Sequence, residues 1–292
     1  MTHHLRQFPT LGRCIALAMV ALLTTLSSAG AAEAVESAGK INKLSKPTPV
    51  VKGEEVSQRS SVFLGPMEKS SEIRITDMET ARSIQTKTDE DGKYAIEKNI
   101  TNTVIHVSAR GKVFDLRRGR MSDQEVLLSA IAVAREGSPP PQVNILTTLV
   151  AVRANALAGQ ASRGPYARIV MPSVIEQAQL EINDALAIAM PRMRRDDTHL
   201  ASEKDPRDDG SMGQVQLMHV SMVVSEAAAA RGANGLTSLL DDMASEMATL
   251  GRFKSSTVQE LRAAENNMNA IRLLRTLQEE YGFGQACAVH YQ

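Results

Sequence analysis

The stretch that decides the fold reads TKTDEDGKYAI, from Thr86 to Ile96. Threonine and tyrosine favour extended backbone, whereas aspartate and glycine tolerate the positive φ angles of a tight turn. The sequence therefore predicts a β-hairpin whose turn lies at residues 89–92. The same acidic turn offers oxygen ligands to a cation, but it lacks the twelve-residue spacing and the bidentate glutamate of an EF-hand, so a solvated turn is favoured.

Short segments on both sides of this turn alternate polar and apolar residues, as half-buried strands do. The alternation covers residues 72–76, the segment around Ile84, and residues 103–108, and residues 113–116 add one more short strand after Gly111. Several short antiparallel strands separated by turn signals are typical of a β-sandwich. We therefore predict an antiparallel β-sandwich module over residues 62–145.

Two sequence patterns resemble a known family. The T-x-T-D-x-D-G-x-Y pattern looks like the hairpin of carboxypeptidase-regulatory-like modules, which are transthyretin-like or Ig-like β-sandwiches of secreted proteins, and it is carried here by Thr86, Thr88, Asp89, Asp91, Gly92 and Tyr94. The segment VNILTTLVA at residues 143–151 is similar to the junction after which many bacterial exported proteins continue into an Ala-rich helical domain. The loop DPRDDG at residues 205–210, ahead of a long helix, is also similar. The resemblance covers residues 56–251 and implies an exported, surface-associated protein without enzymatic activity.

Residues 123–136 are compatible with either a helix or a strand. Ser122 and Glu125 have the spacing of a helix capping box, and Gly137 fits a helix stop. The family resemblance implies a strand instead, and we favour a strand at the centre, over residues 127–134. The three prolines at 139–141 then interrupt whatever precedes them.

From residue 146 onward, apolar residues recur at spacings of three and four, which predicts a bundle of five helices. Ser173, three residues before Glu176, is the expected N-cap of the second helix. A long helix is expected over residues 215–230, Gly251 closes the next, and the last runs from Thr257 to Gly282. The predicted fold class is thus α+β with two domains, a β-sandwich at 62–145 and an α-helical bundle at 146–292. Methionines at helical spacing should pack its core, among them Met218, Met222, Met243 and Met247.

The N-terminus has the features of a secretory signal peptide. Arg6 and Arg13 precede a 13-residue apolar run, and Ala29-Gly-Ala31 fits the small-residue cleavage site. The run is shorter than the ~20 residues that span a bilayer. We expect residues 1–31 to be removed, residues 32–61 to form a flexible linker, and the mature chain to be periplasmic or extracellular, with no transmembrane segment.

Charge and cysteine content narrow the partners of the mature chain. Lys and Arg total 33, as do Asp and Glu, and loss of the leader removes two arginines and no acid. Nucleic acid is therefore an unsuitable partner, and a protein or envelope component is expected. Cleavage also leaves Cys287 as the one cysteine, which favours a buried small side chain and also permits an intermolecular disulfide.

No pattern of a catalytic or cofactor-binding site is present. The histidines of the mature chain, His106, His199, His219 and His290, show no metal-ligand spacing, and neither G-x-S-x-G nor a glycine-rich phosphate loop occurs. His219 lies in a strongly apolar helix, where a partly buried histidine with satisfied hydrogen bonds is favoured. Arg192, with Arg194 and Arg195, is expected to lie in a solvated loop.

One acidic loop is a weak calcium candidate. Asp205, Asp208 and Asp209 could supply oxygen ligands in a loop that ends at Gly210, and no other cofactor is expected. The favoured function is a non-enzymatic binding or structural protein of the cell envelope or surface. The alternative is an exported enzyme whose site is assembled at the domain junction around His199 and the Asp205 loop.

Overall fold

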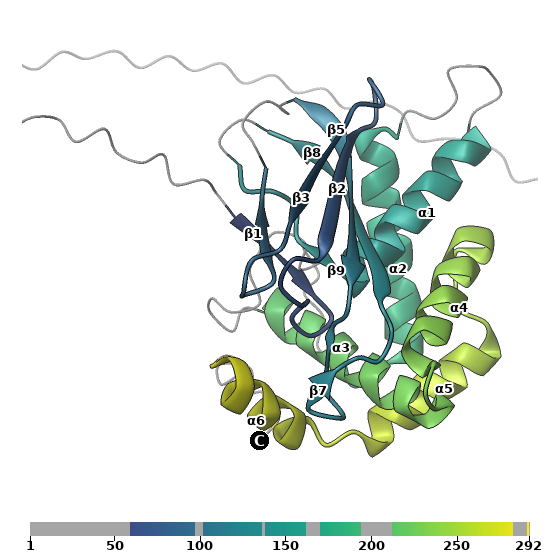
Figure 1. Ribbon diagram of the computed structural model, residues 1–292. Coiled ribbons are helices and arrows are strands. Elements are labelled where there is room, and N and C mark those ends of the chain that lie inside the picture. The colour runs from purple at the N-terminus through teal and green to yellow at the C-terminus, as the bar shows by residue number, and fades with distance from the viewer. Residues whose placement is uncertain are drawn as a thin grey trace, which may run out of the picture. The chain divides into compact units, whose positions relative to one another are not determined.

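The fold is mixed α+β, with sheets in the N-terminal part and helices in the C-terminal part (Figure 1). The computed structural model describes residues 59–96, 102–135, 138–161, 170–193, 212–282 and 291. Residues Gly53–Gln292 belong to one compact unit, so the division into two domains at residue 145 stays a prediction. The predicted signal peptide and most of the linker lie outside the described residues. Within the described ranges, no helix combines the length and apolar character needed to cross a bilayer.

Four antiparallel strands form the larger sheet, in the order β3 (Ser83–Lys87), β2 (Glu72–Asp77), β5 (Thr103–Gly111), β8 (Val126–Ala134). The predicted alternation at residues 72–76 and 103–108 is confirmed. Ile75 pairs with Val107 and both are fully buried, whereas Glu72 and Arg74 on the other face of β2 are exposed. One face of the sheet is therefore apolar and lies in the core.

The smaller sheet has the order β4 (Lys93–Ala95), β1 (Arg59–Phe63), β9 (Val143–Asn144). β4 is antiparallel to β1, but β9 is parallel to it, which departs from the expected all-antiparallel pattern. A short pair, β6 (Phe114–Asp115) and β7 (Arg120–Met121), completes the described strands. Side chains from the four-stranded and the three-stranded sheet join one continuous apolar core. That these two sheets form a sandwich stays a prediction.

The turn at residues 89–92 forms, but the predicted hairpin is wrong. Gly92 has a φ of 69°, and the Asp89 carboxylate accepts hydrogen bonds from the backbone N–H groups of Asp91 and Lys93. However, β3 pairs with β2 and β4 pairs with β1, so the turn carries the chain from one sheet to the other. The backbone of Thr88 instead bonds to Ser70 and Ser71, which prevents the two strands from pairing with each other.

The favoured strand at residues 127–134 is confirmed by β8, which pairs with β5 along its whole length. Ser122 does not cap a helix. Its hydroxyl accepts a hydrogen bond from the Val113 N–H and donates to the Gln124 carbonyl. Local helix propensity is overridden here because pairing with β5 buries Val126, Leu128 and Ala130.

The described residues contain six helices rather than the five predicted: α1 (Ile145–Ala161), α2 (Pro172–Ala189), α3 (Met212–Arg231), α4 (Gly235–Leu250), α5 (Ser255–Asn267), α6 (Ala270–Tyr281). The single helix expected from Thr257 to Gly282 is wrong. Met268 is extended, and the Asn269 side chain accepts a hydrogen bond from the Arg272 N–H, which starts a new helix. The left-handed caps expected at Gly251 and Gly282 are confirmed, with φ of 65° and 72°, and so are the four core methionines, all fully buried.

The N-cap predicted at Ser173 is wrong. α2 begins one residue earlier, at Pro172, and Met171 occupies the cap position without a side-chain hydrogen bond. Proline is well suited to the first helical position because its φ is already helical and it has no N–H to satisfy. Ser173 therefore lies inside the first turn of α2.

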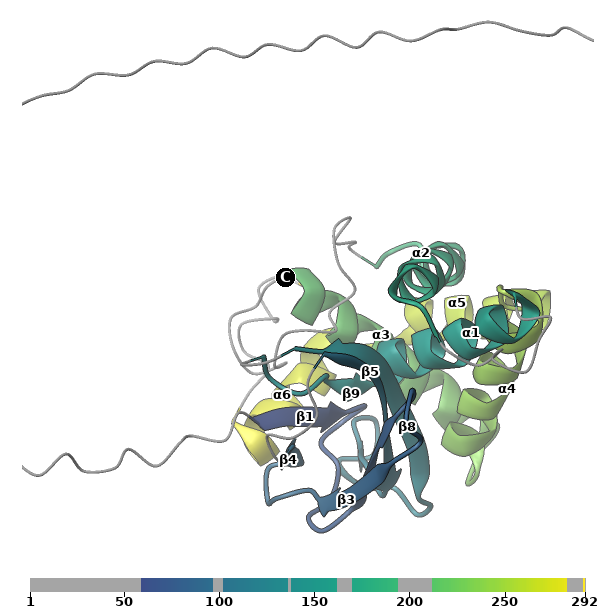
Figure 2. The ribbon, with the colours of Figure 1, turned by 90° about the horizontal axis from the view of Figure 1, so that it is seen from above.

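The segment at residues 146–148, called the LTT segment below, joins the larger sheet to α1. Asn144 caps α1: its side chain accepts a hydrogen bond from the Thr147 N–H, and the Thr147 hydroxyl accepts one from the Asn144 N–H. The Thr147 hydroxyl also donates to the Ser129 carbonyl, and the Thr148 hydroxyl accepts from the Ser129 N–H, at 2.9 Å each. The free edge of β8 is thus satisfied by the start of α1. Figure 1 and Figure 2 show α1 and α2 beside β8, which both helices contact.

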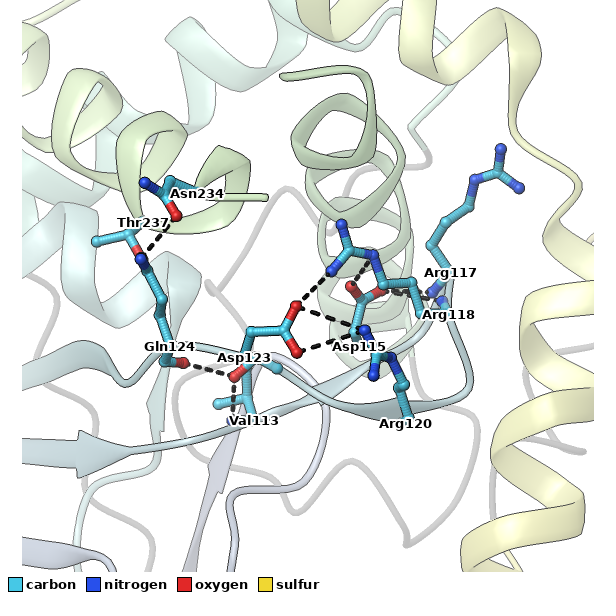
Figure 3. Close-up of polar contacts among 10 residues, drawn as sticks. Val113, Asp115, Arg117, Arg118, Arg120, Asp123, Gln124, Asn234 and Thr237 are labelled. Atoms are coloured by element: carbon cyan, nitrogen blue, oxygen red, sulfur yellow. Dashed lines mark hydrogen bonds and ion pairs between the residues drawn. The ribbon is translucent and has the colours of Figure 1, made fainter. Parts of the chain in front are cut away.

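A second connection between the strands and the helices lies where the segment around β7 meets α3 and α4 (Figure 3). The Gln124 amide donates to the Asn234 side chain at 2.7 Å and accepts from the Thr237 hydroxyl. Arg117 pairs with Glu226 of α3 at 2.8 Å. The Gln124 contacts hold the start of α4 against the N-terminal part, and the Arg117 pair holds α3 there.

Candidate functional site

A pocket of about 510 Å³ opens where α5 breaks from α6. Its walls come from four parts of the chain. Arg192 follows α2, Val215 and His219 lie on α3, Glu265 lies near the end of α5, and the residues of the break and of the first turn of α6 complete it, together with Tyr291. The interruption of the helix at Met268 thus places polar residues around a concave surface.

The floor of the pocket is a buried histidine bonded to a buried glutamate. The His219 Nε2 atom lies 2.8 Å from the Glu265 Oε1 atom, and the two side chains are 4% and 1% exposed. The His219 Nδ1 atom lies 3.1 Å from the Tyr291 hydroxyl. The two rings also stack, with an interplanar angle of 11°. The expectation of a histidine with satisfied hydrogen bonds is confirmed, and His219 is more deeply buried than the partial burial expected.

Burial and the neighbouring polar groups determine the protonation state of the His219 imidazole. Burial lowers the pKa of His219 below 6.5, and the nearby positive charge of Arg192 lowers it further, while the hydrogen bond to Glu265 acts in the opposite direction. The imidazole is therefore neutral near pH 7. Its Nε2–H then donates to Glu265, and its Nδ1 accepts from Tyr291, so both ring nitrogens are engaged.

Acidification from about pH 7 to about pH 5 should destabilise the folded protein. The pKa of His219, and also that of partly buried His106, is lowered on folding by desolvation, so the unfolded chain takes up protons first as the pH falls. The contribution is present above 6.5 and is lost as the pH falls below it. Urea midpoints at the two pH values measure it, and His219→Gln should reduce the difference. An unchanged or higher midpoint at the lower pH would contradict the assignment.

Glu265 uses only one of its oxygens in these contacts. The Oε1 atom also accepts a hydrogen bond from the Arg192 backbone N–H at 3.1 Å, whereas the Oε2 atom has no hydrogen-bond partner among the described residues. The Arg192 guanidinium lies at the exposed rim and pairs with no described acid. Within the part of the chain that the structure describes, the pocket therefore contains a carboxylate oxygen at its floor and a cation at its rim that no other group engages.

The arginine-rich segment between β6 and β7 is not a comparable site. Figure 3 shows Arg118 and Arg120 turned toward the carboxylates of Asp115 and Asp123. Arg118 pairs with Asp123 at 3.1 Å, and Arg120 pairs with the same carboxylate at 3.3 Å. Because these charges are neutralised locally, the segment has little capacity to bind an external anion.

Among the described residues, the pocket brings together two that the sequence singled out, His219 and Arg192. The calcium candidates Asp205, Asp208 and Asp209 lie outside the described residues, as do His199, His290 and Cys287. His106 lies on β5, in the sheet part. Within the described ranges, no group of three or more His, Cys, Asp or Glu could hold a metal ion.

Sequence reasoning missed the pocket because its residues are far apart in the chain. Glu265 lies 46 residues from His219 and 73 from Arg192. The one local signal is the asparagine-rich run ENNMN at residues 265–269, because asparagine side chains bond to nearby backbone groups and so favour helix caps over helix interiors.

The chain matches no family model, and no similar protein is found among the curated proteins or the solved structures. The resemblance to carboxypeptidase-regulatory-like modules therefore stays a prediction. The function is argued below from the geometry of the pocket and from the sequence.

Proposed function

We propose that this protein is an exported, non-enzymatic binding protein of the cell envelope or surface, and that the pocket at the break between α5 and α6 takes its ligand. The observation that carries the proposal is the pocket itself, with the buried His219–Glu265 pair at its floor. Its volume of about 510 Å³ is in the range of small-molecule sites, and polar and apolar side chains share its wall.

Binding is favoured over catalysis by the state of the imidazole. A general base needs a free lone pair within reach of the substrate, but Nδ1 accepts from Tyr291 and Nε2 donates to Glu265. The network instead holds the floor of the pocket in one conformation. The alternative of an enzyme around His199 and the Asp205 loop concerns residues outside the described ranges and stays a prediction.

Export is supported by the sequence features of residues 1–31. The test is the intact mass of the protein recovered from the periplasm or the culture medium after expression of the full chain. Loss of residues 1–31 is the expected result, and a full-length protein retained in the cytoplasm would contradict it.

The binding function is tested with the chain from residue 32 onward. Equilibrium dialysis against the low-molecular-weight fraction of an envelope extract, read by mass spectrometry, should show at least one enriched compound. Ile271→Trp places a large ring on the pocket wall at a residue that is 45% exposed, and it should abolish the enrichment. Leu250→Trp, at a similarly exposed residue outside the pocket, is the matched control and should retain it.

Two outcomes of this experiment would count against the proposal. No enriched compound with the folded wild-type protein, or equal enrichment by Ile271→Trp, would remove the pocket as the binding site. Chemical conversion of the enriched compound by the wild-type protein would favour the enzyme alternative.

A further inference from the structure

At the floor of the pocket, the buried Glu265 carboxylate has one oxygen with no described hydrogen-bond donor, and a ligand can supply that donor. The Glu265 side chain is almost fully buried, yet its hydrogen bonds from described residues all fall on Oε1. A buried carboxylate is stable only when its oxygens are hydrogen-bonded or paired with a positive charge. The neutral His219 supplies one donor and no charge. A cationic N–H donor entering the pocket would complete the shell of Glu265.

The rim presents the opposite chemistry. The Arg192 guanidinium is exposed there, and Ala270 and Ile271 are the first two residues of α6, so their N–H groups have no acceptor within the helix. Asn269 uses its side chain to cap the N–H of Arg272 and not these two. An arginine beside the N-terminal end of a helix favours a carboxylate.

Other residues of the pocket wall are apolar. Val215 of α3 is buried, and Met268 and Ile271 of the break contribute aliphatic surface that is partly exposed to solvent. An aliphatic side chain of a ligand would cover this surface and gain the corresponding hydrophobic free energy.

We infer that the pocket binds a small zwitterionic amino compound, an α-amino acid with an aliphatic side chain, whose ammonium group meets Glu265 and whose carboxylate meets Arg192. The inference rests on the proposed function, because it names the ligand class of the same pocket. It accounts for the unengaged oxygen, the unengaged cation and the apolar wall together.

The test is isothermal titration calorimetry of the chain from residue 32 onward with L-leucine and L-methionine. Isocaproate has a leucine-like side chain and a carboxylate but no ammonium group, whereas isoamylamine keeps the amine and has no carboxylate. We expect leucine or methionine to bind, and each analogue to bind at least about tenfold more weakly, since each lacks one charge-assisted contact.

Two variants assign the contacts. Glu265→Gln keeps an acceptor for His219 and for the Arg192 N–H but removes the charge, and Arg192→Ala keeps the backbone N–H that holds Glu265. Each should weaken binding about tenfold or more. Arg252→Ala, an exposed arginine outside the pocket, is the control and should bind like the wild type. Far-UV circular dichroism and thermal melts establish that every variant is folded.

The results separate this inference from the function on which it rests. Absence of leucine and methionine binding at millimolar concentration, or equal binding of isocaproate or isoamylamine, would overturn the inference. If the dialysis experiment still enriches a compound without an amino zwitterion, the binding function stands and the ligand class is wrong. If neither experiment finds a ligand, both are wrong.

Discussion

His219→Leu is expected to destabilise the protein by about 3 kcal/mol, because it leaves the buried Glu265 carboxylate with the Arg192 backbone N–H as its one described donor. The two side chains are 4% and 1% exposed, so leucine would keep covering the Oε1 atom of Glu265, and little water from the pocket would reach that atom. Leucine fills most of the volume of the imidazole, and the cost is therefore that of the unpaired carboxylate and not of a cavity. Urea unfolding followed by far-UV circular dichroism measures the change in free energy of unfolding.

The double variant His219→Leu with Glu265→Leu is the control for this explanation. Replacing both partners by apolar groups removes the buried charge together with its donor, so much of the lost stability should return. A double variant that is less stable than His219→Leu alone would show that the effect comes from packing. A single variant as stable as the wild type would show that Glu265 finds another partner.

The strands of the N-terminal part follow from local patterns, but their pairing does not. Alternation over residues 72–76 reports a strand with one buried face, and β2 has that face. The acidic turn at residues 89–92 reports a tight turn, and Asp89 and Gly92 form it. Whether the strands on either side of this turn pair with each other depends on Ser70 and Ser71, which lie some twenty residues earlier. Their backbone groups form hydrogen bonds with the backbone of Thr88. A turn signal in the sequence contains no information about that competition.

The same distinction applies to the helices and to the candidate site. The spacing of apolar residues after Thr257 continues through Met268 to Tyr281, so periodicity alone predicts one helix. The break is decided by the Asn269 side chain, which caps the N–H of Arg272. His219 was expected to have satisfied hydrogen bonds, and it has, but its partner Glu265 lies on another helix. The pocket exists because of this break, which is why periodicity could not reveal it.

The LTT segment illustrates how a sequence pattern can have a structural explanation. Its threonine hydroxyls bond to both backbone groups of Ser129, and Asn144 caps the helix that follows. An edge strand with unpaired backbone groups is a site of unwanted association, and two threonines at the start of a helix can cover it. The pattern therefore needs no ligand to explain its composition.

Gly235→Ala should destabilise the protein by about 3 kcal/mol, because the added Cβ atom would overlap the backbone of α3. Gly235 begins α4, and a Cβ atom there would lie 1.9 Å from the Ala228 carbonyl oxygen and 2.8 Å from its carbon. The close approach of α4 to α3 would have to open, and α3 carries His219. Thermal and urea unfolding should both record the loss.

Gly159→Ala is the matched control, since no atom lies within 4 Å of the Cβ atom that it would add on the exposed side of α1. Alanine has a higher helix propensity than glycine, so this variant should be more stable than the wild type by up to about 1 kcal/mol. The two substitutions are chemically identical, but their effects on stability should have opposite signs, because the added Cβ atom is crowded at residue 235 and not at residue 159. A small effect of Gly235→Ala would mean that α4 can move away from α3 at little cost, and would contradict the close packing of the two helices as a source of stability.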